Sequence, residues 1–213
     1  MSEKRYQGPA PVARSPIPPA GTVRVEDGWE VGDHRATAAL TLADASATAK
    51  ITVRATPSGP MPEALGTRFG RTVRDGDRLI VGSGPGEWLV IAAYSEAAKV
   101  EAWLTEQGTT DPEPVSVVDV SHGRALMRLT GSRAADVLAK LCAVDLSDAI
   151  VPDGGAFRSS VAKLVTDVVR DDTDGTRSYL LHCERSSGRY LWGCVLDAGA
   201  EYGIQATDAG SVS

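Results

Sequence analysis

The sequence lacks the features by which membrane and secreted proteins are recognised. No apolar run approaches the about 20 residues that are needed to cross a bilayer. Lys4 and Arg5 stand near the start, but no apolar stretch of the kind found in signal peptides follows them. Only three cysteines occur, an odd and sparse count that is typical of a reduced protein. The sequence therefore predicts a cytoplasmic protein with no membrane partner.

An excess of basic residues is also missing. The chain of 213 residues has 22 Lys and Arg against 28 Asp and Glu, a formal net charge of -6. Proteins that bind nucleic acid usually present a basic face, so this balance argues against a nucleic-acid partner. What is present is ordinary for a globular protein: 42% of the residues are hydrophobic, and the length suffices for one large domain or two small ones.

Both ends of the chain lack a pattern that builds a core. Five prolines fall within the first twenty positions, which disfavours a regular helix or a central strand there. The sequence therefore predicts an extended arm over residues 1–34 that a partner subunit holds. The small, polar residues 205–213 predict a flexible tail, which leaves residues 35–204 as the folded domain.

The domain divides into two similar halves, at about residues 48–120 and 121–204. Each half shows the order strand, helix, strand, strand, helix, strand, judged from apolar alternation and from apolar stripes at helical spacing. The strongest internal similarity joins the segments that begin at Trp88 and Tyr179, each a strand, a short polar joint and a helix. The sequence therefore predicts an α+β fold of two ferredoxin-like split βαβ modules, with antiparallel sheets covered on one face by helices.

Glycines alternate at residues 82–86, in the run Gly-Ser-Gly-Pro-Gly. A phosphate loop needs a helix N-terminus directly after it, whose free N–H groups bind the anion. Here a strand pattern follows from Glu87 to Ile91, and no Lys-Ser or Lys-Thr pair accompanies the glycines. The pattern therefore favours a hairpin turn over a phosphate site.

Asp119, Ser121 and His122 lie within four residues and invite comparison with a catalytic triad. Triad side chains converge from separate elements rather than from neighbouring positions, and in a strand Ser121 and His122 would point to opposite faces. The alternative is a crossover between the halves, in which Gly123 allows a bend and Asp119 or Ser121 binds backbone N–H groups. We favour the crossover.

Metal binding has equally little support. His182, Cys183 and Cys194 follow no recognised ligand spacing, and lone cysteines usually act as small buried hydrophobic residues. The acidic run at residues 171–175 resembles half of a calcium loop but lacks the downstream Glu, so it predicts a solvated hairpin tip. The sequence predicts no catalytic residue, no cofactor-binding residue and no metal ligand in this chain.

One helix, expected from about Ser187 to Tyr202, combines a wide apolar surface with two internal glycines, Gly193 and Gly199. Each glycine costs about 1 kcal/mol relative to alanine in a helix, a cost that close packing against another backbone would offset. Either the core of this chain or a partner subunit supplies that packing.

Several phrases of the sequence resemble the gamma subunit of heterotetrameric sarcosine oxidase. They are Glu-Trp-Leu at residues 87–89, Asp-Val-Ser-His at 119–122, the nine residues Leu-Ala-Lys-Leu-Cys-Ala-Val-Asp-Leu at 138–146, and Arg-Ser-Pro-Ile at 14–17. The resemblance spans about residues 79–202. It implies the fold of the folate-binding domain of the glycine cleavage T protein.

The resemblance also implies a function, that of a non-catalytic gamma subunit in a complex that oxidatively demethylates sarcosine or a related N-methyl amine. In that family the alpha and beta subunits carry FAD, FMN, NAD and the tetrahydrofolate site, a delta subunit binds zinc, and the gamma subunit holds no cofactor. Alpha, beta and delta subunits are therefore the expected partners. The alternative, implied by the same fold, is a free-standing folate-binding or aminomethyltransferase-like protein.

Overall fold

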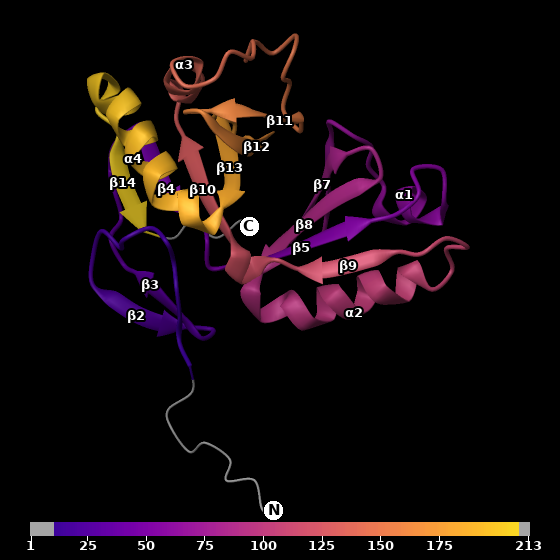
Figure 1. The fold of residues 1–213 in the computed structure, drawn as a ribbon. Coiled ribbons are helices and arrows are strands. Elements are labelled where there is room, and N and C mark those ends of the chain that lie inside the picture. The colour runs from indigo at the N-terminus through magenta and orange to yellow at the C-terminus, as the bar shows by residue number, and fades with distance from the viewer. Residues whose placement is uncertain (1–10, 209–213) are drawn as a thin grey trace, which may run out of the picture.

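The computed structural model describes residues 11–208. Two modules of sheet and helix form the body of the molecule, and a small three-stranded sheet lies beside them near the N-terminus (Figure 1). In this described part of the chain, no helix is long and apolar enough to span a membrane.

The first module contains one antiparallel sheet and two helices. In spatial order its strands are β6 (Thr72–Asp75), β7 (Arg78–Gly84), β8 (Glu87–Ala93), β5 (Thr48–Arg54) and β9 (Ser116–Asp119). Alternate residues of β5, such as Ile51 and Val53, are buried in one cluster with Val100 and Leu104 of α2 (Ala97–Gly108). The short helix α1 (Pro60–Leu65) ends at Gly66, whose φ of 64° is the left-handed value that glycine adopts readily.

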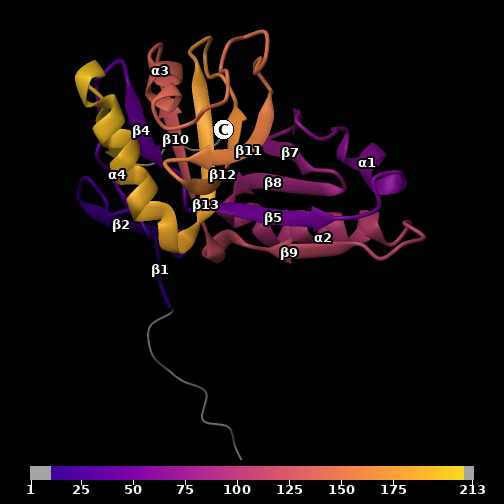
Figure 2. The ribbon, with the colours of Figure 1, turned by 45° about the horizontal axis from the view of Figure 1, so that its top comes forward.

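The second module repeats this topology. In spatial order its strands are β11 (Ala156–Val161), β12 (Leu164–Arg170), β13 (Ser178–Glu184), β10 (Arg124–Thr130), β4 (Thr41–Asp44) and β14 (Gln205–Asp208). Helices α3 (Ala134–Ala139) and α4 (Gly188–Gly199) contribute to the same core cluster as these strands (Figure 2). The orders β9-β5-β8-β7 and β4-β10-β13-β12 correspond, and each is a ferredoxin-like sheet; β6 is added at one edge of the first, and β11 and β14 are added at the two edges of the second. The predicted α+β fold is confirmed.

The two segments that resemble each other in sequence form elements of equal length. Strand β8, a 3-10 turn (Tyr94–Glu96) and α2 have 7, 3 and 12 residues, and β13, a second 3-10 turn (Arg185–Ser187) and α4 have the same three lengths. Each module therefore makes the turn from a central strand into its long helix in the same way.

Two strands depart from the predicted division into residues 48–120 and 121–204. Strand β4 precedes the first module along the chain but pairs with β10 of the second, and β14 pairs with β4 in parallel. Residues 205–208 of the predicted tail are thus a strand, because β4 offers them an unpaired edge on which to complete their hydrogen bonds. Residues 209–213 lie outside the described part.

Residues 13–32 form a small sheet rather than an extended arm. Strand β1 (Ala13–Arg14) pairs with β3 (Trp29–Gly32), which forms a hairpin with β2 (Val23–Glu26). The turn residues Asp27 and Gly28 both have positive φ, 48° and 79°, as a two-residue type I′ turn requires. The prolines exclude a helix from this region, but they stand outside the hairpin and do not exclude it. Residues 1–10 of the predicted arm lie outside the described residues.

The glycine-containing helix α4 is packed largely by its own chain. Leu191, Trp192 and Val195 are buried in the core of the second module. A Cβ placed on Gly199 would lie 2.8 Å from the side chain of Ile204, so this glycine is required by packing within the chain. The face around Gly193 is open, because a Cβ there would meet no atom of the described structure within 4 Å.

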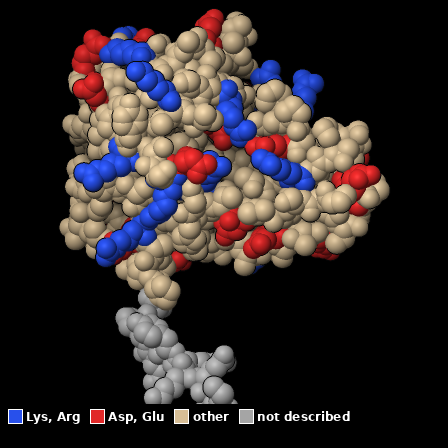
Figure 3. Space-filling model, in the orientation of Figure 1, with Lys and Arg blue, Asp and Glu red and all other residues tan. Residues whose placement is uncertain are grey.

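The two modules meet through the sheet faces that their helices leave uncovered. One buried cluster joins the two sheets and includes Val81, Leu89, Ile91, Leu126, Val169 and Leu180. On the outer face shown in Figure 3, basic and acidic side chains are interspersed rather than collected in one basic patch.

Candidate functional site

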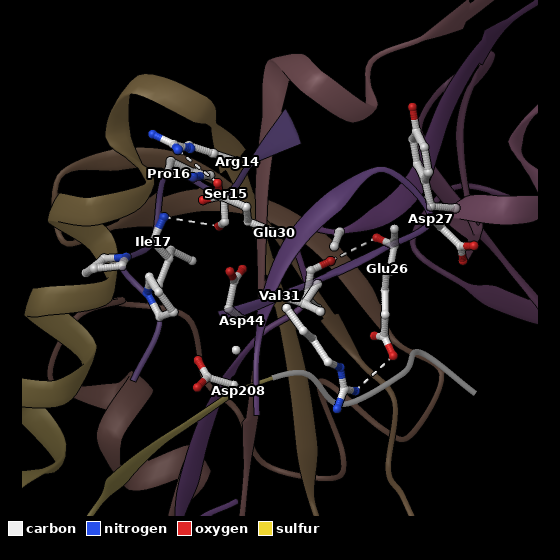
Figure 4. Close-up of a pocket in the computed structure, with 18 of the residues that line it drawn as sticks. Arg14, Ser15, Pro16, Ile17, Glu26, Asp27, Glu30, Val31, Asp44 and Asp208 are labelled. Atoms are coloured by element: carbon white, nitrogen blue, oxygen red, sulfur yellow. Dashed lines mark hydrogen bonds and ion pairs between the residues drawn. The ribbon is translucent and has the colours of Figure 1, made fainter. Parts of the chain in front are cut away.

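A cavity of about 640 Å³ opens between the N-terminal hairpin and the two modules (Figure 4). Its walls come from the segment after β1, the β2–β3 hairpin, the end of β4, the start of β5, the turn that contains Tyr94, and Arg189 of α4. All of these elements contribute residues to its walls, and small ligands usually bind in clefts at such junctions.

Asp44, at the end of β4, places a half-buried carboxyl group in this cavity. Its Oδ1 accepts the backbone N–H of Ser46 at 2.9 Å. Burial raises the pKa of Asp44, against the opposing effects of hydrogen bonds from Ser15 and Ser46. Burial therefore makes the charged form of this carboxyl group less favourable than it would be at the surface.

Asp208 lines the same cavity but serves a structural purpose. Its carboxylate accepts the backbone N–H groups of Ala20, Gly21 and His34 at 2.9, 2.8 and 3.1 Å. Arg35 donates to its backbone carbonyl. Asp208 therefore ties the N-terminal segment to β14 and closes one wall of the cavity.

Ion pairs on the hairpin form the outer lip of the cavity. Arg14 contacts Glu30 at 2.9 Å, and Arg24 contacts Glu26 at the same distance. The side chains of Arg14 and Arg24 are 74% and 50% exposed, so water screens both pairs and neither adds much stability. Because each of these arginines faces a glutamate, the two pairs add no net positive charge to the entrance.

Lys50 lies behind the cavity and was not recognised from the sequence as a special residue. The side chain is fully buried, and its Nζ donates to the carbonyls of Ser46 and Thr48 at 2.7 Å each. Burial lowers the pKa of Lys50 to about 7, although the charge of Asp44 opposes the change. In the sequence Lys50 occupies the polar phase of a half-buried strand, and segments outside that strand cover it, among them Trp29, whose ring centroid lies 5.9 Å from the Lys50 Nζ.

The segment 119–123 is the crossover that we favoured. The carboxylate of Asp119 accepts the N–H of Ser121 at 2.8 Å, and the hydroxyl of Ser121 accepts the N–H of Lys50 at 2.9 Å. His122 stacks on Trp29 with ring centroids 4.8 Å apart and its Nε2 lies 2.9 Å from the Tyr94 hydroxyl. Because Ser121 and His122 contact different partners, they do not form a nucleophile and base.

The glycines at 82–86 form the predicted hairpin turn between β7 and β8, with Gly86 at φ 69°. The acidic run also forms a turn, with Asp174 and Gly175 at positive φ. The prediction that this run is solvated is wrong for Asp171, whose side chain is only 9% exposed and pairs with Arg74 and Arg128 at 2.8 and 2.6 Å. Asp171 is buried because these two arginines, which are distant from it in the sequence, pack against its carboxylate.

The cysteines and His182 are not assembled into a metal centre. Cys142 and Cys183 are buried and Cys194 is half-buried, all three as free thiols. Burial raises the pKa of Cys183 to about 11, which keeps the thiol protonated. Within residues 11–208, no three His, Cys, Asp or Glu side chains are grouped as metal ligands. His182 instead lines a second, smaller cavity together with Asp167.

The class of protein follows from this architecture: two ferredoxin-like modules packed through their open sheet faces, with a cavity at the junction. The family model of the GCVT N-terminal domain matches residues 67–212, and the chain belongs to that family. The aminomethyltransferase of Geobacillus thermodenitrificans is 35% identical over 128 residues, which are 60% of this chain and 34% of that protein. The chain thus spans about a third of the length of such relatives.

Two solved structures share the fold. A chain of the heterotetrameric sarcosine oxidase from Corynebacterium sp. U-96 matches with a TM-score of 0.67 and 24% identity, over 85% of this chain and 91% of that chain. The aminomethyltransferase of the glycine cleavage system from Bartonella henselae matches with a TM-score of 0.69 and 14% identity, over 88% and 56%. The relationship to these two kinds of protein, expected from the sequence, is confirmed.

Proposed function

We propose that this chain is a non-catalytic, gamma-type subunit of a heterotetrameric, flavin- and folate-dependent complex of the sarcosine oxidase type. The length of the structural match carries the proposal: it covers 91% of a sarcosine oxidase chain but 56% of an aminomethyltransferase. The chain therefore corresponds more fully to a chain of that complex than to the whole aminomethyltransferase.

Two side chains of the crossover favour a structural role for this chain over a chemical one. Ser121 and His122, which resemble catalytic residues in the sequence, bind the backbone of Lys50 and the hydroxyl of Tyr94. In this proposal FAD, FMN, NAD, tetrahydrofolate and zinc are bound by the alpha, beta and delta subunits. The complex acts in the cytoplasm on sarcosine or a related N-methyl amine.

Co-purification tests the proposal directly. The tagged chain, expressed from its native context, is expected to retain larger chains whose absorbance shows bound flavin. The purified chain alone is expected not to oxidise sarcosine or dimethylglycine, whereas the assembled complex oxidises one of them. Oxidation by the isolated chain, or isolation of the chain without flavin-bearing partners, would contradict the proposal.

The second candidate function is folate binding by this chain itself, and the cavity beside Asp44 favours it. In the related T-protein fold, folate lies in a central cavity where an acidic residue engages the pterin. A cavity of about 640 Å³ has room for a pterin, and Asp44 is the half-buried acid that would hold its amino-pyrimidine edge.

Calorimetry with tetrahydrofolate separates the two functions. Micromolar binding to the isolated chain, lost in Asp44→Asn and kept in the cavity-lining control Asp27→Asn, would favour folate binding by this chain. No detectable binding would argue against this second function and would favour the subunit role, in which another subunit of the complex holds folate.

A further inference from the structure

The outer face of α4 is left uncovered by the described part of the chain, and the helix lies at the edge of the molecule (Figure 1). Arg189, Tyr190, Gly193 and Asp197 are all exposed on this face and line a shallow, open hollow. They lie on one side of the helix, because the other three are each three or four residues from Gly193. Apart from Arg189, which also reaches the wall of the larger cavity, these residues have no part in the proposed functions.

Gly193 is not required by packing within the chain. A glycine in a helix interior costs about 1 kcal/mol relative to alanine. Contact with Ile204 explains this choice at Gly199, but a Cβ added at Gly193 would meet no described atom within 4 Å. Helix α2, which has the same length and the same place in the first module, carries an exposed alanine, Ala102, at the corresponding sixth position. The topology of a module therefore does not require glycine there, whereas close approach of another backbone from outside would.

The charges of this face indicate what approaches it. Arg189 and Asp197 are exposed, and neither has an ion-pair partner among the described residues. They stand four residues before and four residues after Gly193, so about 12 Å of helix separates them, too far for a pair within one helix. An antiparallel helix of the same sequence, centred on Gly193, brings Arg189 of each copy beside Asp197 of the other. The face is thus complementary to itself, as a twofold interface between identical chains must be.

We propose that the chain associates with a second copy of itself through this face, with the two α4 helices antiparallel about a twofold axis beside Gly193. Two reciprocal ion pairs between Arg189 and Asp197 fix the register of the helices. Tyr190, which is 55% exposed, supplies the largest apolar side chain of the contact. A contact through one helix of 12 residues is small, so the dimer is weak and reversible. A complex built on this contact contains two copies of the chain.

Sedimentation velocity of the full-length chain over a range of concentrations tests the proposal. The native chain is expected to shift from monomer to dimer as its concentration rises. Arg189→Asp and Asp197→Arg each place like charges together at both ends of the contact, so each variant alone is expected to associate at least about tenfold more weakly. An equimolar mixture of the two variants places opposite charges together again. It is expected to form a mixed dimer with nearly the native affinity, which association through another face would not do.

Gly193→Gln tests the close approach of the helices. Its side chain would hold them apart, so association is expected to weaken about tenfold, although glutamine is a better helix former than glycine. The matched control Ala102→Gln, at the corresponding position of α2, is expected to associate like the native chain, and circular dichroism checks that both variants fold.

Three results would overturn the proposal: a native chain that is monomeric at every concentration, association that the single charge reversals leave unchanged, or no recovery in the mixture. Protection of α4 from amide exchange only when larger chains are bound would instead assign this face to another subunit. Co-purification of flavin-bearing chains is a separate measurement, so failure of this proposal does not contradict the proposed function.

Discussion

The stability of the folded chain depends on several buried charged residues, and each of them has a different kind of hydrogen-bond or ion-pair partner. Asp171 has two arginine partners, Asp208 has three backbone N–H groups, and Lys50 has two backbone carbonyls. Leaving a buried charge unpaired costs several kcal/mol in general. A substitution or a change of pH therefore removes different interactions at each of these groups: ion pairs at Asp171 and backbone hydrogen bonds at Asp208 and Lys50.

Lys50 should make stability depend on pH. Because its pKa is about 7 in the folded chain and near the ordinary 10.5 when unfolded, the unfolded chain binds more protons between these values, and the free energy of unfolding rises with pH there. In urea titrations at pH 6.5 and pH 9.5 we expect the native chain to gain on the order of a few kcal/mol relative to Lys50→Met.

The control for this measurement is Lys163→Met, at an exposed lysine, which should show the same pH dependence as the native chain. If Lys50→Met also matched the native chain at both pH values, Lys50 would not titrate as the buried amine that the structure indicates.

Asp171→Asn should destabilise the protein strongly. The substitution leaves the buried guanidinium of Arg128, now 2.6 Å from the carboxylate, without its counter-charge. We expect a loss of about 3 kcal/mol in the free energy of unfolding measured with urea. Asp174→Asn, at the exposed tip of the same turn, where φ is 51° and asparagine is well tolerated, should change it by less than about 0.5 kcal/mol. Similar losses in both variants would refute this account.

At the scale of elements, one large side chain of the N-terminal hairpin anchors it to the first module and to the crossover. Trp29 of β3 is fully buried, stacks on His122 and meets the edge of Tyr94 with ring centroids 5.5 Å apart. These contacts join the hairpin to the crossover and to the turn before α2. The hairpin therefore covers one side of the larger cavity without belonging to either module's sheet.

Trp29→Ala should release the hairpin. Loss of a buried tryptophan costs about 3–5 kcal/mol in general, and here the cost should appear as early proteolytic cleavage within residues 13–32 while the modules stay intact. Val25→Ala, at a residue of β2 that is 58% exposed, should be cleaved no faster than the native chain. Equal resistance of Trp29→Ala would mean that other contacts hold the hairpin. That the N-terminal region lies on a partner subunit stays a prediction.

At the scale of the whole molecule, the two modules are interlocked by β4. The strand leaves the N-terminal region, lies between β10 and β14 in the second sheet, and then leads into β5 of the first. Non-local pairing of this kind means that the second module is incomplete until the N-terminal region has joined it.

Deletion of residues 1–47 should therefore abolish cooperative thermal unfolding of the second module, because β10 and β14 lose the strand between them. Deletion of residues 1–32 removes the hairpin but keeps β4, and should leave a cooperative transition at lower temperature. The measurement is calorimetry combined with amide exchange in β10 and β13. Equal stability of the two truncated chains would show that β4 is dispensable.

Much of the fold could be predicted from the sequence because its causes are local. Alternating apolar residues specify β5 and β10, apolar runs specify β8 and β13, apolar spacing of four specifies α2 and α4, and Pro85 and Gly86 specify a turn. The Asp27-Gly28 pair is an equally local hairpin signal. The prediction of an extended arm was wrong there because it rested on the prolines alone.

Only the tertiary structure decided where the chemistry lies. Thr52 and Lys50 occupy the same polar phase of one strand, yet Lys50 is completely buried, whereas Thr52 is half-buried beside the smaller cavity. Asp44, His182 and Asp171 acquire their surroundings in the same way, from segments far away in the chain. Periodicity in a sequence reports which face of an element is apolar, whereas the packing of two modules determines which polar residues lose their water.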